Sequence, residues 1–302
     1  MRIGIFADTS GTIADIVGRA EEAERDGFQS FFVSHIFGPD ALTTLAVVGQ
    51  RTSRIELGTS VVPVYGRHPH ALAQQALTTQ AASGGRLTLG IGLSHQIVVE
   101  TMWGLSYEKP AVHMREYLSV LVPLLHGEAA GYSGEIFRVN AGLQIPVTKP
   151  PGLLLAALAP AMLRMAAERA DGTVTWMTGV KAIETHIAPR LNAAAEAVGR
   201  PHPRICVGLP IAVTDDPKGA RERAAQMFQM YGQLPNYQRV LAKSGAESPG
   251  DVAIVGSEAE VEGQLRALAK AGATDFLAVQ FPADGDAIER TKALLKKLLG
   301  SI

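Results

Sequence analysis

Cysteine is nearly absent from this sequence, which has only Cys206 among its 302 residues. One cysteine cannot form an internal disulfide or a cysteine-based metal site. It lies inside the apolar segment RICVGLPIAV, residues 204–213. We therefore expect a buried cysteine that packs as a small hydrophobic residue, not a nucleophile.

An excess of charge of either sign is also missing, because 28 Lys and Arg face 29 Asp and Glu, for a net charge of −1. This balance does not indicate a nucleic-acid partner or an anionic membrane surface. Apolar runs of the roughly 18 residues that a transmembrane helix needs are absent. The chain begins MRIGIFAD, which is typical of a strand and not of a signal peptide. We expect a cytoplasmic protein.

Apolar residues are plentiful, at 47%, and they form strand-like segments that alternate with helical ones. The predicted strands are 2–7, 30–34, 54–62, 86–93, 152–158, 172–177, 204–213 and 274–281. The predicted helices are 12–27, 40–51, 70–83, 110–126, 160–170, 181–198, 217–243 and 258–271, with an amphipathic helix at the C-terminus. A small hairpin is expected in GYSGEIFRVN.

Eight strand–helix units predict a parallel sheet buried on both faces. We expect a single (β/α)₈ TIM barrel over residues 1–302, with insertions after the fourth strand and between the seventh and eighth. A doubly wound open sheet is the alternative, but eight strands in 302 residues favour the barrel.

In such a barrel the active site lies at the C-terminal ends of the strands. The side chains there are rich in His, Ser and Thr and poor in carboxylates, which argues against a two-carboxylate glycosidase. His35, His68 and His95 follow three different strands and could converge on a metal, as in a metal-dependent hydrolase. Trp176 ends the sixth strand and is either a pocket wall or a core aromatic.

Two neighbouring strand ends indicate a phosphate site. In LAPAMLRMAAERADG, Pro160 opens a helix after small residues, so the N–H groups of Ala161 and Met162 should be free. A helix N-terminus without an acidic side chain favours a phosphate. TWMTG offers hydroxyl groups and Gly179 at the next strand end. Ordinary helix capping is the alternative for either segment alone.

The whole chain resembles the luciferase-like flavin-dependent oxidoreductases, and within them the branch that uses coenzyme F420. The segments that carry the resemblance are AEEAERDGFQSFFVSHIF, RIELGTSVVPVYGRHPHALAQQALTTQAASGGRLTLGIGLSH, ERADGTVTWMTG and EVEGQLRALAKAGATDFLAV. The second is the most specific, because it joins a strand, a Thr-Ser-Val step, a basic residue, a proline and GRLTLGIG.

The resemblance implies a homodimer and a non-prolyl cis peptide at Ser60–Val61, which forms a bulge behind the cofactor ring. It implies that the cofactor contacts Ser60, Val61, Val62, Leu93, Ser94, Ala159, Pro160, Ala161, Met162, Trp176, Met177, Thr178 and Gly179. The chain departs from the sugar-phosphate dehydrogenases of this branch at two places. His35 stands alone where they have an acid–histidine pair, and His95 stands where they have a glutamate.

The predicted function is hydride transfer between coenzyme F420 and a small organic substrate, with His35 or His95 as the general acid or base. The alternatives are an FMN-dependent monooxygenase of the same family, the metal-dependent hydrolase, and a cofactor-storage protein without activity. The rim of the site is expected to carry Tyr65, Arg67 and His68, and Lys181 is a further candidate for binding a substrate phosphate.

Overall fold

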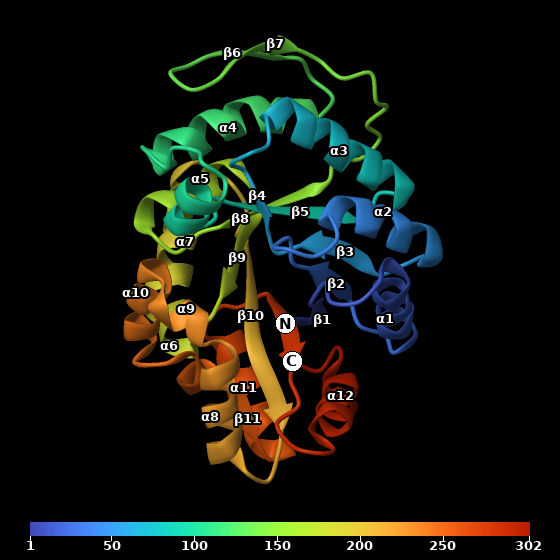
Figure 1. The fold of residues 1–302 in the computed structure, drawn as a ribbon, viewed down its shortest axis with the longest axis vertical. Coiled ribbons are helices and arrows are strands. Elements are labelled where there is room, and N and C mark those ends of the chain that lie inside the picture. Colours follow the sequence, from blue (N-terminus) through green and yellow to red (C-terminus); the bar gives the residue numbers. More distant parts are fainter.

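Eight parallel strands close into a barrel in the computed structural model, which describes residues 1–302 (Figure 1). In spatial order they are β1 (Arg2–Ala7), β2 (Ser30–Val33), β3 (Glu56–Thr59), β5 (Leu87–Gly92), β8 (Gly152–Ala156), β9 (Gly172–Trp176), β10 (Arg204–Val213) and β12 (Asp275–Gln280). Asp275 lies opposite both Arg2 and Cys206, so β12 joins β1 to β10 and closes the barrel. The predicted TIM barrel is therefore confirmed.

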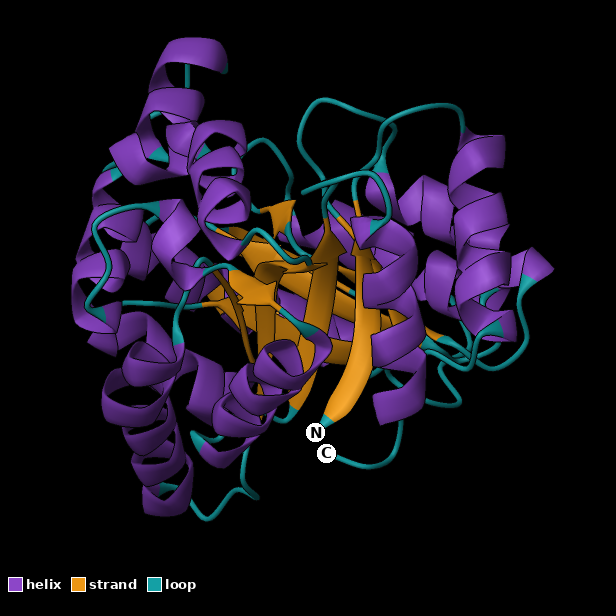
Figure 2. Ribbon diagram, turned by 90° about the horizontal axis from the view of Figure 1, so that it is seen from below, coloured by secondary structure: helices purple, strands orange, loops and turns teal.

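Helices surround the barrel, and Figure 2 shows them on both sides of the strands. They include α1 (Ile13–Arg25), α2 (Ala41–Arg51), α3 (Pro69–Ala82), α5 (Pro160–Arg169), α6 (Val180–Ala182), α7 (Ala188–Ala197), α11 (Glu258–Lys270) and α12 (Ala287–Leu298). A π-helical turn, η2 (Ile183–Ile187), joins α6 to α7 inside the helix predicted for 181–198. No helix combines the length and apolar character that crossing a bilayer requires.

The first insertion follows β5, and its hairpin lies outside α3 and α4 (Pro110–Leu125) at the top of Figure 1. The insertion contains η1 (Val98–Met102), α4 and the hairpin of β6 (Ala130–Ser133) and β7 (Arg138–Ala141). The Glu116 carboxylate on α4 accepts three backbone N–H groups of the hairpin turn, at 2.8 to 3.0 Å. This buried side chain therefore fixes the predicted hairpin to α4.

The second insertion lies between β10 and β12. The long helical region predicted for 217–243 is confirmed, but it is divided into α8 (Pro217–Met227), α9 (Gln229–Gln233) and α10 (Pro235–Ser244). Pro235 has no N–H to continue the ladder, so α9 ends before it and α10 begins with it. The turn η3 (Pro249–Val252) and an unpredicted strand, β11 (Ile254–Gly256), follow, and β11 pairs with the far end of β10.

A layer of inward-facing side chains fills the barrel: Phe32, Leu154, Val174, Cys206 and Leu277, with Phe6 and Val61 packed against it. Cys206 is fully buried, as expected, and burial raises the pKa of its thiol. The interior of the barrel is therefore a packed core, and ligand chemistry is confined to its ends.

Candidate functional site at the barrel mouth

The loops after β2 and β4 (Val62–Pro63) bring His35 next to Arg67 and Asp40. Asp40 caps α2 by accepting the Thr43 N–H at 2.8 Å, and its Oδ2 is 3.0 Å from Arg67 Nη2. The same Nη2 is 3.0 Å from His35 Nε2. The guanidinium therefore bridges a helix-capping carboxylate and the imidazole that the sequence marks as catalytic.

Arg67 and Ala41 both present donors to the ring of His35. The Arg67 guanidinium can only donate, at 3.0 Å from Nε2, and the Ala41 backbone N–H donates to Nδ1 at 3.2 Å. A neutral imidazole has one acceptor nitrogen, so the two bonds alternate. When Nε2 accepts from Arg67, the protonated Nδ1 faces Asp40 Oδ2, 3.7 Å away. Burial and Arg67 lower the pKa of His35, and Asp40 opposes them. Near neutral pH, His35 is thus an uncharged proton acceptor.

The peptide bond between Ser60 and Val61 is cis, at the position that the resemblance names. The Val61 side chain reaches into the barrel and packs on the interior layer. It also covers two glycines of β5: a Cβ at Gly92 would lie 2.7 Å from Val61 Cγ2, and one at Gly90 would lie 3.2 Å from Val61 Cγ1. Because both neighbours lack a Cβ, Val61 fits there and forms part of the floor of the barrel mouth.

His95 follows β5 and is half-buried. Burial lowers its pKa, and its ring centroid is 5.6 Å from that of Tyr237 on α10. Ser94, just before it, has a left-handed backbone with φ of 61°. That turn directs the chain from β5 into the first insertion, and His95 comes to face the second insertion.

Aromatic side chains from the second insertion meet those of the barrel mouth. We call the following residues the aromatic wall: Phe6, Trp176, Phe228, Tyr231, Tyr237 and His95. Trp176 contacts Phe6, Phe228 and Tyr231 edge-on, with centroids 5.5 to 5.7 Å apart, and Tyr231 is 5.2 Å from Tyr237. Trp176 is therefore half-buried among aromatic rings at the C-terminal end of β9. The sequence pattern did not point to Phe228, Tyr231 and Tyr237, although three aromatic residues within the segment 228–237 were a usable signal.

The N-terminus of α5 has the features of the predicted phosphate site. Ala159 caps the helix without a side-chain hydrogen bond, and the first turn has no acidic residue. The first helical bond runs from the Leu163 N–H to the Ala159 carbonyl, at 2.9 Å, so the N–H groups of Ala161 and Met162 have no protein acceptor. Both Ala159 and Ala161 are exposed to solvent.

The neighbouring TWMTG segment is more tightly packed than the sequence suggests. Thr178 is buried and donates to the Trp176 carbonyl at 3.2 Å. The Gly179 N–H donates to Ser244 Oγ at 3.0 Å, so it is not a free phosphate donor. A Cβ at Gly179 would lie 3.0 Å from both Ser244 Cβ and Val252 Cγ1. Gly179 therefore allows α10 and η3 to approach the mouth closely.

The expected rim position of Tyr65 is wrong, and the possible convergence of three histidines is not found. Tyr65 is buried and stacks on His113, with centroids 4.1 Å apart, so it does not line the rim. His68 caps α3 and packs edge-on against Phe137, whereas His35 faces Arg67 and His95 faces Tyr237. No group of three or more His, Cys, Asp or Glu side chains is placed to hold a metal ion. The three histidines therefore do not converge, which removes the basis for a metal-dependent hydrolase.

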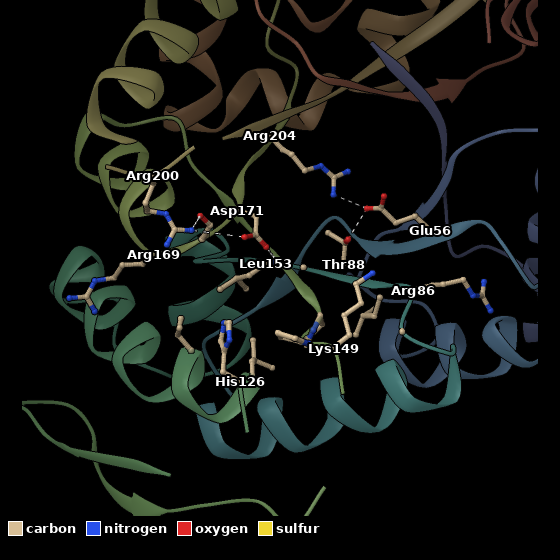
Figure 3. A pocket seen from close by; sticks show the side chains of 18 of the residues that line it. Glu56, Arg86, Thr88, His126, Lys149, Leu153, Arg169, Asp171, Arg200 and Arg204 are labelled. Atoms are coloured by element: carbon tan, nitrogen blue, oxygen red, sulfur yellow. Dashed lines mark hydrogen bonds and ion pairs between the residues drawn. The ribbon is translucent and has the colours of Figure 1, made fainter. Parts of the chain in front are cut away.

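A cleft of about 650 Å³ lies at the opposite, N-terminal end of the barrel (Figure 3). Its charged side chains hold strand ends together: Arg204 Nη1 is 2.9 Å from Glu56 Oε1, which also accepts the Thr88 hydroxyl at 2.7 Å. Asp171 accepts the Leu153 N–H at 2.8 Å. These contacts stabilise the barrel, and the cleft is far from the strand ends that carry the candidate site.

Comparisons with known proteins agree with this fold. The sequence profile of the family described as luciferase-like monooxygenase matches residues 1–275. A protein of Mycobacterium tuberculosis, provisionally named a coenzyme F420-dependent oxidoreductase, is 33% identical over 67% of this chain, and the match spans 62% of its own length. The 5,10-methylenetetrahydromethanopterin reductase of Methanolobus tindarius is 26% identical over 99% of this chain and 91% of its own.

Among solved structures, the coenzyme F420-dependent tetrahydromethanopterin reductase from Methanopyrus kandleri superimposes with a TM-score of 0.83. The superposition covers 98% of this chain and 97% of the reductase, at 20% sequence identity. At that identity the likeness is one of fold.

Proposed function

Because this chain belongs to the luciferase-like monooxygenase family, we propose that it is an oxidoreductase that transfers a hydride between coenzyme F420 and a small organic substrate. The names of the Mycobacterium and Methanolobus relatives support the choice of cofactor. In this chain the proposal rests on the N-terminus of α5. Its free N–H groups lie at the same end of the barrel as Val61 and the aromatic wall.

These residues fit a molecule that has a flat ring and a phosphate. The N–H groups of Ala161 and Met162 would bind the phosphate, with the positive end of the helix dipole behind them. Val61 would support one face of the ring, and Trp176 would bound its edge. The proposed cofactor contacts remain those that the resemblance implies, but Gly179 contributes through close packing, since Ser244 takes its N–H. Val62 and Met177 are buried and would contribute through their backbone.

When bound, coenzyme F420 would supply or accept one hydride, which is a proton together with two electrons. In the reducing direction the substrate carbon gains that hydride, and its oxygen or nitrogen gains a proton from a side chain or water. We assign the proton transfer to His95 and His35. The lone pair of His35 Nε2 makes His35 the base for the oxidising direction once Arg67 moves aside.

An FMN-dependent monooxygenase is the second candidate, favoured by the description of the family. Titration of the cofactor-free protein with coenzyme F420 and with FMN, followed by absorbance, separates the two. Saturable binding of coenzyme F420 at a lower concentration than FMN supports the proposal. Preference for FMN rejects it.

We also propose that the protein is a cytoplasmic homodimer. The exposed Ile13 and Val47 lie on the neighbouring helices α1 and α2 and offer an apolar surface for a second copy. Light scattering at micromolar protein concentration measures the mass in solution and so tests the homodimer. A dimeric mass that Val47→Asp converts to a monomeric mass supports this interface, and a monomeric parent protein rejects the homodimer.

A further inference from the structure

The cleft at the N-terminal end of the barrel has a local excess of positive charge. Six of its lining residues are arginine or lysine and two carry carboxylates, in a protein whose net charge is −1. The six cations are Arg54, Arg86, Lys149, Arg169, Arg200 and Arg204. A cleft lined by charge of one sign concentrates counter-ions more strongly than a flat surface does. We call this cavity the basic cleft.

Part of this positive charge has a structural role. Arg204 pairs with Glu56 at 2.9 Å. Arg86 donates to two carbonyls at the C-terminal end of α2, both at 2.8 Å, and Arg200 donates to the Ala170 carbonyl at the end of α5, also at 2.8 Å. The C-terminal end of a helix carries about half a negative charge. The two helix ends therefore offset the charges of Arg86 and Arg200 only in part.

Lys149 has no structural partner for its ammonium group. Figure 3 shows its side chain pointing into the cleft, with no hydrogen bond or ion pair drawn to it. Its backbone is nonetheless fixed, because the buried Gln80 side chain donates to the Lys149 carbonyl at 3.0 Å and accepts the Leu87 N–H at 2.8 Å. Gly85 leaves room beside the lysine, whose Cδ would lie 3.9 Å from a Cβ there. A positioned ammonium group without a counter-ion is suited to binding an anion.

Two arginines of the basic cleft also keep most of their charge. The Arg54 side chain makes no hydrogen bond or ion pair, although Glu24, which accepts the Arg54 backbone N–H, reduces its field. Arg169 donates to a neutral group, the Ser119 hydroxyl, at 2.8 Å. The available cations therefore come from three separate segments: the one before β3, the one before β8 and the end of α5.

We propose that the basic cleft is a second ligand site, separate from the barrel mouth, for a small molecule with at least two anionic groups, carboxylate or phosphate. Its volume of about 650 Å³ lies in the range of small-molecule sites. Five of its 19 lining residues are hydrophobic, whereas a site for an uncharged ligand is lined mainly by apolar side chains. Two or more anionic groups are required because the available cations lie on separate segments. This site does not depend on the proposed function.

The test is calorimetric titration of the purified protein with pyrophosphate and with citrate, at a constant ionic strength of about 0.15 M. Inorganic phosphate and acetate are the matched ligands with one anionic group. We expect pyrophosphate or citrate to bind saturably and at least tenfold more tightly than its matched ligand. The one that binds more tightly identifies the preferred anionic group. If neither binds more tightly than its matched ligand, the proposal is overturned.

Variants place the ligand in the basic cleft. Lys149→Gln should weaken binding about tenfold, because a hydrogen bond between two charged groups is lost. The Lys149 side chain makes no hydrogen bond or ion pair that this change would break, so the Tm without ligand should stay the same. Arg169→Gln should also weaken binding. Lys297→Gln removes the same charge from an exposed position on α12, outside the cleft, and should bind as the parent does.

The same variants separate this site from the barrel mouth. If pyrophosphate and citrate bind Lys149→Gln and Arg169→Gln as tightly as the parent, they occupy another site, such as the N-terminus of α5, and the proposal is wrong. A ligand that binds only the folded protein also raises its Tm. We expect that rise to be smaller in Lys149→Gln than in Lys297→Gln, and an equal rise in both would contradict the assigned site.

Discussion

Replacing Gly92 with alanine should disturb the floor of the barrel mouth and weaken cofactor binding. The new Cβ would lie 2.7 Å from Val61 Cγ2 and 3.1 Å from Ala156 Cβ. Carbon atoms in favourable contact are about 3.5–4.0 Å apart, so Val61 must move by close to 1 Å. The interior layer blocks movement into the barrel. Val61 would therefore shift toward the space that we assign to the cofactor ring.

The expected magnitudes follow from overpacking. Inserting a methyl group into a well-packed site costs about 1–3 kcal/mol, which for a chain of this size lowers Tm by a few degrees. Affinity for coenzyme F420 should fall about tenfold or more, equivalent to ~1.4 kcal/mol. The assays are a thermal melt of the cofactor-free protein and a fluorescence titration with the cofactor, both done below the Tm of the variant.

Gly263→Ala is the matched control, because no heavy atom lies within 4 Å of a Cβ at that position on α11. Alanine in place of glycine inside a helix should stabilise the protein by about 0.5–1 kcal/mol and leave cofactor affinity unchanged. If Gly92→Ala loses stability but binds coenzyme F420 as tightly as the parent, the ring does not lie against Val61. That result would refute the position that we assign to the cofactor ring.

Three further predictions concern the histidines. His95→Ala should lower kcat by more than tenfold with a smaller change in KM, since proton transfer by a positioned side chain contributes about 10²–10⁴-fold; the opposite pattern would make His95 a binding residue. Arg67→Met should raise the pKa of His35, because a guanidinium that lowers it is removed; ¹⁵N NMR of labelled histidine measures this, and an unchanged titration contradicts the assigned contact. The pKa values of four histidines are lowered in the folded protein, mainly by burial: His35, His95, His113 and His186. The unfolded chain therefore binds more protons once the pH falls to about 6.5, so urea unfolding should show stability decreasing below that pH; a stability that is flat between pH 7 and 5 would contradict it.

The barrel could be predicted from the sequence because its strands are apolar runs separated by helices, and that alternation leaves few topologies. The break at Pro235 could have been predicted as well, since proline ends the helix that precedes it. β11 has only three residues and pairs with the extended far end of β10. A segment that short has too little periodicity to be recognised before the pairing is known.

The sequence predicted which strand ends carry the candidate site. It did not predict most of the contacts between the side chains there. His35 and Arg67 are 32 residues apart, and the pairing of β2 with β3 brings the loops that carry them together, to 3.0 Å. The loss of the Gly179 N–H to Ser244 depends on where α10 lies, which the sequence pattern does not specify. The burial of Tyr65 could not be predicted from the sequence either, because it depends on stacking with His113 from the first insertion.

The most direct measurement of the central claim is the side-by-side titration of the purified, cofactor-free protein with coenzyme F420 and FMN. The account predicts saturable, one-to-one binding of coenzyme F420 that is tighter than binding of FMN. It also predicts that Gly92→Ala weakens this binding while Gly263→Ala does not. Tighter binding of FMN, or binding of neither cofactor, would contradict the assignment of this barrel mouth to a deazaflavin.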